Sequence, residues 1–120
     1  MNPFLAVFIG GGFGSLARYS LSLWIKTMTA TQLPIATLGA NMLSTIVLAV
    51  AFFTLKPTTP AWIYTLIGIG FCGGFSTFST FSLETFQLLK TGQIAWAVAN
   101  VLVSISLCLL ILFLFSKTIK

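Results

Sequence analysis

The chain has 120 residues, of which 58% are hydrophobic and only 6% are charged, and its net charge is +5. Soluble domains carry about 25% charged residues, so this composition excludes them and indicates an integral membrane protein. It also excludes a disordered chain, a coiled coil and a disulfide-stapled secreted domain. One acid and no histidine argue against a metallohydrolase, and six scattered basic residues do not form the clustered patch of a nucleic-acid-binding protein.

Four apolar segments are long enough to cross a bilayer. They cover residues 4–25, 34–55, 61–83 and 94–115, and a spanning helix needs about 20 residues. Backbone polar groups in lipid must be satisfied internally, and these segments are too long for barrel strands. We therefore expect an all-α membrane protein in which residues 1–120 form a single integral-membrane four-helix domain.

Basic residues in the connections do not favour one orientation of the chain. Lys56, Lys117 and Lys120 fall on the side of the termini, whereas Lys26 and Lys90 fall on the opposite side, with Arg18 inside the first span. Orientation follows an excess of Lys and Arg in cytoplasmic loops, so this balance leaves two interpretations open. One is a fixed topology set by other features, and the other is insertion in both directions, with pairing of inverted copies.

The first segment combines spaced glycines with an arginine. Gly10 and Gly14 lie on one face of the predicted helix, a spacing that is typical of close helix packing. Arg18 lies about two turns, roughly 10 Å, from the end of the segment. Its side chain can extend to the interface, or it can hold a fixed positive charge at the mouth of an aqueous vestibule, and the sequence leaves both roles open.

The third segment contains the most unusual stretch of the chain. The adjacent Gly73 and Gly74 favour a break in the middle of the spanning helix, which is tolerated only where backbone is buried in protein or lines a cavity. Freed carbonyls at such a break can coordinate a cation, and freed amides can face an anion.

Aromatic and hydroxyl side chains alternate after these glycines. The phenylalanines are Phe75, Phe78 and Phe81, and the hydroxyls are Ser76, Thr77, Ser79, Thr80 and Ser82. Aromatic rings have electropositive edges, so ring edges and hydroxyl donors together can solvate a small anion. The alternative is an aromatic packing ridge whose hydroxyls bond back to the helix.

Polar residues also occur in the second and fourth segments. Asn41 lies near the middle of the second segment, and Thr37 lies on the same face. Asn100, Ser104 and Cys108 form a stripe along the fourth segment. Each set is explained either by helix–helix contacts or by the lining of a polar path.

The distribution of donors and acids favours an anion as the transported species. Glu84 is the only acid and is predicted at the end of the third segment, away from the middle of the membrane. Donors without acids favour an anion over a cation or a cationic drug. The alternative, a small multidrug-resistance-type transporter, needs an acid in the first segment, which has none. No nucleophile, base and orienting group occur together, so an enzyme is not expected.

Three motifs together resemble the Fluc/CrcB fluoride channel family. They read Gly10-Gly11-x-x-Gly14-Ser15-x-x-Arg18-Tyr19, Thr37-Leu38-x-x-Asn41 and Gly70-Phe71-Cys72-Gly73-Gly74-x-Ser76-Thr77-Phe78-Ser79-Thr80-Phe81-Ser82. The resemblance covers the whole chain, and the third motif is highly specific. It implies an antiparallel, dual-topology homodimer with two pores in the cell inner (plasma) membrane. Such a dimer exports fluoride passively from the cytoplasm and so protects against fluoride toxicity.

The resemblance also implies roles for individual residues in the fluoride pore. Phe78 and Phe81 match the "Phe box", whose ring edges contact fluoride, and Asn41 matches a donor to fluoride. Arg18 matches the arginine near the vestibule. The polar lining of the pore is extended by Thr37, Ser79, Thr80 and Ser104.

A structural sodium ion, which is not transported, is implied at the centre of the dimer. Its ligands match the backbone carbonyls of Gly73 and Ser76, and oxygen ligands suit a hard cation. The chain departs from the family pattern at a few positions. Ser44 stands where a glycine often follows the asparagine, and Asn100 stands where tyrosine is common, so an aromatic contact from the fourth segment is not expected.

Overall fold

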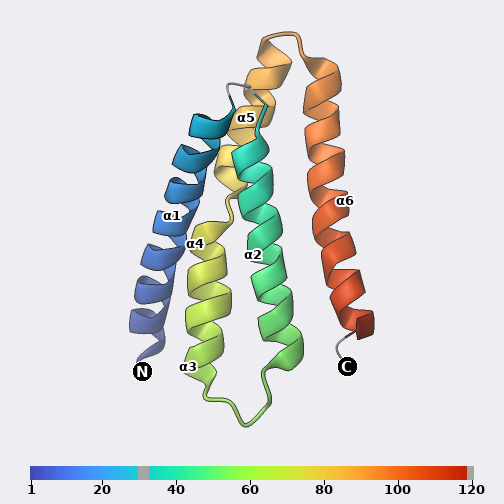
Figure 1. The fold of residues 1–120 in the computed structure, drawn as a ribbon. Coiled ribbons are helices and arrows are strands. Elements are labelled where there is room, and N and C mark those ends of the chain that lie inside the picture. The colour runs from blue at the N-terminus through green and yellow to red at the C-terminus, as the bar shows by residue number, and fades with distance from the viewer. Residues whose placement is uncertain (30–32, 119–120) are drawn as a thin grey trace.

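The computed structural model describes residues 1–29 and 33–118, which form a bundle of four long helical segments (Figure 1). The elements are α1 (Pro3–Met28), α2 (Ile35–Thr54), α3 (Ala61–Tyr64), the π-helix η1 (Thr65–Cys72), α4 (Gly73–Phe75), α5 (Phe78–Lys90) and α6 (Ile94–Thr118). No strand occurs within the described ranges. Four segments are long and apolar enough to cross a membrane, which confirms the predicted all-α class with four spanning helices.

The third span is longer than predicted. It runs from Ala61 to Lys90, beyond the expected end at residue 83, because the polar residues that follow are good helix formers. Gly92, with φ of 84°, then allows the turn that ends the helix. Glu84 therefore lies within α5 rather than at the end of a helix.

The two ends of the bundle carry equal numbers of described lysines. The start of α1, the end of α6 and the turn between α2 and α3 lie at one end, and the turn between α5 and α6 lies at the other (Figure 1). Lys56 and Lys117 belong to the first end, and Lys26 and Lys90 to the second. Lys120 lies outside the described residues. The orientation of the chain in the membrane stays a prediction.

α1 packs closely against η1 and α4. Gly10 and Gly14 are buried at this crossing. A Cβ atom would lie 2.1 Å from the carbonyl oxygen of Leu66 if added to Gly10, and 2.2 Å from that of Phe71 if added to Gly14. The two glycines are therefore packing residues, and they bring backbone against backbone, as small residues do at helix contacts in membranes.

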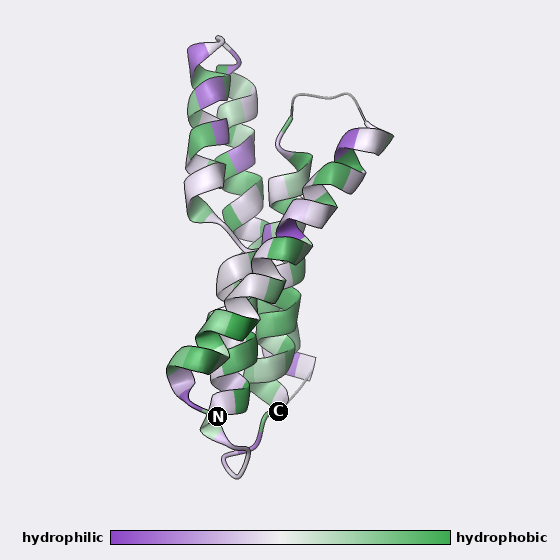
Figure 2. Cartoon of the chain, turned by 90° about the vertical axis from the view of Figure 1, so that its left-hand side faces the viewer, coloured by the Kyte–Doolittle hydropathy of each residue, from purple (hydrophilic) through white to green (hydrophobic). Residues whose placement is uncertain are grey.

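The bundle opens toward the end that carries the α5–α6 turn. Figure 2 shows α5 and the adjoining part of α6 diverging from the C-terminal part of α1, with more polar colouring on this half of the molecule. α6 packs mainly on α2 and α5. This divergence exposes the region around the break in the third span.

Candidate functional site

The third span is broken at Ser76 and Thr77, one residue after the glycine pair. Ser76 (φ −80°, ψ 158°) and Thr77 (φ −152°, ψ 121°) are extended, whereas Gly73 and Gly74 remain helical in α4. The predicted break is confirmed, but it lies after the glycines rather than at them. Thr77 caps α5, since its hydroxyl oxygen accepts a hydrogen bond from the backbone N–H of Thr80 at 3.1 Å.

Two side chains of α2 bind the broken backbone. The N–H of Thr77 donates to Asn41 Oδ1 at 2.8 Å, and Asn41 Nδ2 donates to the Thr77 carbonyl at 3.4 Å. Ser44, which is buried, donates to the Cys72 carbonyl at 2.9 Å. Ser76 also donates to that carbonyl, through its N–H and its hydroxyl. The bond to Asn41 satisfies the Thr77 N–H, which the break would otherwise leave unpaired in lipid, whereas the Cys72 carbonyl keeps its helical donor, the Ser76 N–H.

The same bonds change which carbonyls at the break have donors. In a continuous helix the N–H of residue i bonds to the carbonyl of residue i−4, so Gly73 would pair with Thr77 and Ser76 with Thr80. Asn41 and the Thr77 hydroxyl take those two N–H groups instead. A Cβ atom on Gly73 would meet nothing within 4 Å, so the chain leaves open space there. Carbonyl oxygens at an unwound helix are ligands for sodium, and the residues present fit such an ion.

A groove of about 280 Å³ lies on one side of the break. Four predicted pore residues line it, namely Asn41, Phe78, Phe81 and Ser104. The rings of Phe78 and Phe81 are 5.8 Å apart at an interplanar angle of 40°. Phe78 is 79% exposed, so most of this residue is uncovered within the single chain.

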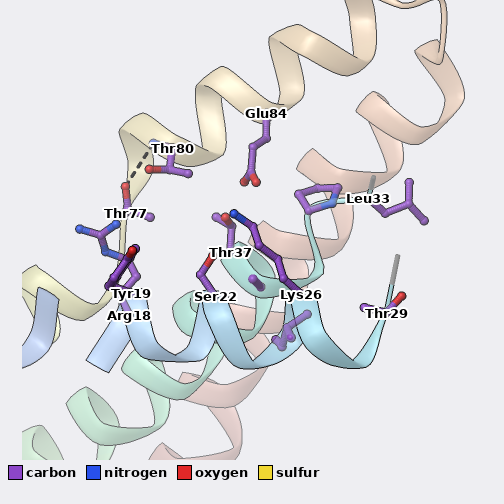
Figure 3. A pocket seen from close by; sticks show the side chains of 13 residues that line it. Arg18, Tyr19, Ser22, Lys26, Thr29, Leu33, Thr37, Thr77, Thr80 and Glu84 are labelled. Carbon is purple, nitrogen blue, oxygen red and sulfur yellow. Dashed lines mark hydrogen bonds between the residues drawn. The ribbon is translucent and has the colours of Figure 1, made fainter. Parts of the chain in front are cut away.

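A cavity of about 390 Å³ lies between α1, α2 and α5 (Figure 3). Its walls include Arg18, Thr37 and Thr80, three further predicted site residues. Glu84 of α5 and Lys26 of α1 also line it, and Figure 3 shows their side chains pointing toward one another. The cavity therefore combines two basic groups, one acid and several hydroxyls.

Arg18 is bound to the backbone just before the break. Its Nε donates to the Gly74 carbonyl at 3.1 Å, and the contact is partly buried. The guanidinium therefore points toward the middle of the third span, and it lines the cavity. The geometry fits the second of the two roles that the sequence left open, a positive charge held beside a polar cavity.

The residues predicted for the pore and the vestibule thus divide between the groove and the cavity, with one exception. Ser79 lines neither and is exposed, with its hydroxyl oxygen 3.3 Å from that of Thr77. Glu84 was not predicted in the site, although its Oε1 is buried without a hydrogen-bond partner among the described residues. Its position follows from the continuation of α5, which hydropathy alone does not reveal.

Asn100 does not line the groove but connects α6 to α5. Its Nδ2 donates to Thr85 Oγ1 at 2.9 Å, and the Thr85 hydroxyl donates to the Phe81 carbonyl at 2.8 Å. Ser104 donates to Asn100 Oδ1 at 3.5 Å. A polar chain therefore runs from Ser104 in the groove to the backbone of Phe81.

These features define a class of protein, an all-helical, multi-pass membrane protein whose third span is broken in the middle, between a groove and a polar cavity. A sequence profile described as "CrcB-like protein, Camphor Resistance (CrcB)" matches residues 5–115. The chain belongs to this CrcB family.

Several curated relatives are similar over most of the chain. One is the "Fluoride-specific ion channel FluC" of Serratia proteamaculans (strain 568), which is 44% identical over 109 residues, covering 88% of this chain and 84% of the relative. "Fluoride-specific ion channel FluC 1" of Yersinia pestis is 44% identical over 108 residues, with the same two shares. The FluC protein of Escherichia fergusonii is 45% identical over 104 residues, covering 84% of this chain and 80% of the relative.

Proposed function

We propose that this protein is a fluoride-selective ion channel of the inner (plasma) membrane, which exports fluoride passively and protects the cell from it. The observation that carries the proposal is the similarity over most of the chain to relatives named as fluoride-specific ion channels. The chemistry needs no energy source. Fluoride crosses the membrane as neutral HF, dissociates inside, and leaves through the channel along the inside-negative potential.

We assign the pore to the predicted residues that line the groove and the cavity, together with Ser79, whose hydroxyl lies beside that of Thr77. Phe78 and Phe81 contact fluoride through their ring edges, which carry partial positive charge, and Asn41 offers an amide donor. Thr37, Thr80, Ser79 and Ser104 extend the polar lining. Arg18 attracts the anion into the cavity, since a fixed charge in a low-dielectric cleft concentrates counter-ions. The proximity of these residues to the break supports this assignment.

We further propose that two chains pair in inverted orientations and form two pores. The exposed ring of Phe78 and the open groove beside it leave a surface that a second chain can complete. Two described lysines at each end of the bundle give no bias toward one orientation. An inverted pair then contributes a Phe78 and a Phe81 from each subunit.

At the centre of this dimer, the backbone carbonyls of Gly73 and Ser76 would hold a structural sodium ion. When bound, the ion would supply a fixed positive charge between the broken spans. The diversion of the helical N–H donors from these carbonyls supports the assignment.

A growth assay tests the proposed function in cells. Expression of this protein should restore the growth of a bacterium that lacks its own fluoride exporter on medium containing fluoride. The matched control is the Phe81→Ile variant at equal membrane abundance, which should not restore growth. Failure of the unaltered protein to restore growth, with normal insertion, would contradict the proposal.

A further inference from the structure

We infer that Asn41 and Thr77 are positioning residues for the central cation, because together they keep two carbonyls of the broken span from forming helical hydrogen bonds. This inference rests on the proposed sodium site and extends it to two side chains outside the ligand set. Asn41 then has a positioning role in addition to lining the groove.

Asn41 prevents the carbonyl of Gly73 from accepting the hydrogen bond of a continuous helix. The N–H of Thr77 is the donor that a continuous helix would bring to Gly73. It donates instead to Asn41 Oδ1 at 2.8 Å, within the usual range for a strong N–H···O bond. Removing the Asn41 acceptor leaves this N–H unpaired in the membrane, so it would return to Gly73 and close the helix.

The hydroxyl of Thr77 acts in the same way on the carbonyl of Ser76. The N–H of Thr80 is the donor that a continuous helix would bring to Ser76. It donates instead to Thr77 Oγ1 at 3.1 Å. Asn41 therefore takes the N–H that would bond to the Gly73 carbonyl, and the Thr77 hydroxyl takes the N–H that would bond to the Ser76 carbonyl.

Other polar side chains of α2 differ in whether they contact the third span. Ser44 donates to the Cys72 carbonyl, which also accepts from the Ser76 N–H at the break. Asn41 and Ser44 are three residues apart on α2 and lie on one face of it. The hydroxyl of Thr45, on the same helix, donates to the carbonyl of Asn41 at 2.7 Å rather than to the third span, so Thr45 provides a matched control.

The test measures how sodium stabilises the purified, full-length protein in detergent. Thermal unfolding is followed by tryptophan fluorescence in sodium chloride or in N-methyl-D-glucamine chloride, at constant total salt. An ion that binds only the folded state raises the melting temperature as its concentration increases. The sodium concentration that gives half of this increase is the quantity compared between variants.

Two Asn41 variants distinguish the role of the amide oxygen, which accepts a hydrogen bond, from the role of the amide nitrogen, which donates one. Asn41→Asp keeps an oxygen acceptor for the Thr77 N–H, so sodium stabilisation should persist at the same or a lower sodium concentration. Asn41→Leu removes the acceptor, and the half-maximal sodium concentration should rise about tenfold or more, since one backbone hydrogen bond now competes with the ion. Fluoride flux is expected to be impaired in both variants, so flux alone does not decide the question.

The Thr77 variants keep the inference testable if Asn41→Leu fails to fold. Thr77→Ser retains the capping hydroxyl and should respond to sodium as the unaltered protein does. Thr77→Val removes it and should need about tenfold more sodium, whereas Thr45→Val should respond normally.

Two results would overturn the inference in distinguishable ways. Equal sodium responses in the unaltered protein, Asn41→Leu and Thr77→Val would remove the positioning role and leave the sodium site standing. If Asn41→Leu does not fold, an equal response in Thr77→Val alone leads to the same conclusion. Absence of any sodium effect in the unaltered protein would remove the sodium site as well, and a normal fluoride flux in the same preparation would show that the channel function survives.

Discussion

The guanidinium of Arg18 and the carbonyl of Gly74 are joined by a 3.1 Å hydrogen bond across 56 positions of the chain. This bond fixes a positive charge at the inner end of the cavity, beside the broken backbone. An arginine held by one nitrogen keeps its other N–H groups available. The hydrogen bond links α1 to the break and contributes to the positive charge of the cavity.

Replacing Arg18 with leucine should lower fluoride flux. The loss should be about tenfold or more at low ionic strength, because a charge in a cleft raises the local anion concentration, and it should shrink as salt is added. Flux is measured from liposomes over a range of inert salt. Lys56→Gln, which removes a charge from the far end of the bundle, is the control, and an equal loss in both variants would contradict a local effect.

Neutralising Glu84 should act in the opposite direction. Glu84 lines the same cavity as Arg18 and Lys26, and its charge opposes the approach of an anion. Glu84→Gln should therefore raise fluoride flux a few-fold at low ionic strength, with little change near 1 M salt, where the Debye length is about 3 Å. Lower flux in Glu84→Gln at every salt concentration would show that the carboxylate assists the anion instead.

Removing either aromatic ring from the groove should stop conduction without dissociating the protein. Phe78→Ile and Phe81→Ile keep an apolar side chain but lose the electropositive ring edge. Flux is measured with a fluoride electrode, and assembly is checked by size-exclusion chromatography. Undiminished flux in both variants would refute the ring-edge contacts.

The crossing of α1 with η1 and α4 should be sensitive to a single methyl group. Gly14→Ala places a Cβ atom 2.2 Å from the Phe71 carbonyl oxygen, so the helices must separate, and overpacking of this kind costs about 1–3 kcal/mol. Gly12→Ala is the matched control, because a Cβ atom there meets nothing within 4 Å. A lower melting temperature is expected for Gly14→Ala alone, and equal melting temperatures would contradict the close approach.

Cysteines placed near the two ends of the chain test the inverted pairing. Asn2→Cys and Thr118→Cys lie at the same end of the bundle (Figure 1). In a dual-topology population a membrane-impermeant thiol reagent should label each variant from outside and, after permeabilisation, label a further fraction of similar size. The unaltered protein, in which Cys72 is buried and Cys108 is half-buried, gives the background. Labelling from one side only would refute dual topology.

The four spans could be predicted because they depend on local properties. Length and hydropathy alone identify a spanning helix, and the small residues at Gly10 and Gly14 predicted the close crossing of α1. Asn41, Ser104 and Thr37, polar residues that line the groove or the cavity, were also found from sequence, because polar groups inside a membrane segment are rare. Glu84, which lines the cavity as well, was not.

The details of the third span could not be predicted in the same way. The glycine pair suggested a break at Gly73 and Gly74, yet the chain unwinds at Ser76 and Thr77. The position is set by Asn41, which lies 36 residues from Thr77 in sequence and takes its N–H. The π-helix η1 likewise depends on packing against α1 and α2 rather than on local propensity.

Anion efflux from liposomes that contain only this purified protein tests the central claim most directly. Vesicles are loaded separately with fluoride and with chloride, a potassium ionophore relieves the charge imbalance, and ion electrodes record the release. We predict rapid release of fluoride and no release of chloride. Equal release of both anions, or none of fluoride from correctly inserted protein in the presence of sodium, would contradict the proposed channel function.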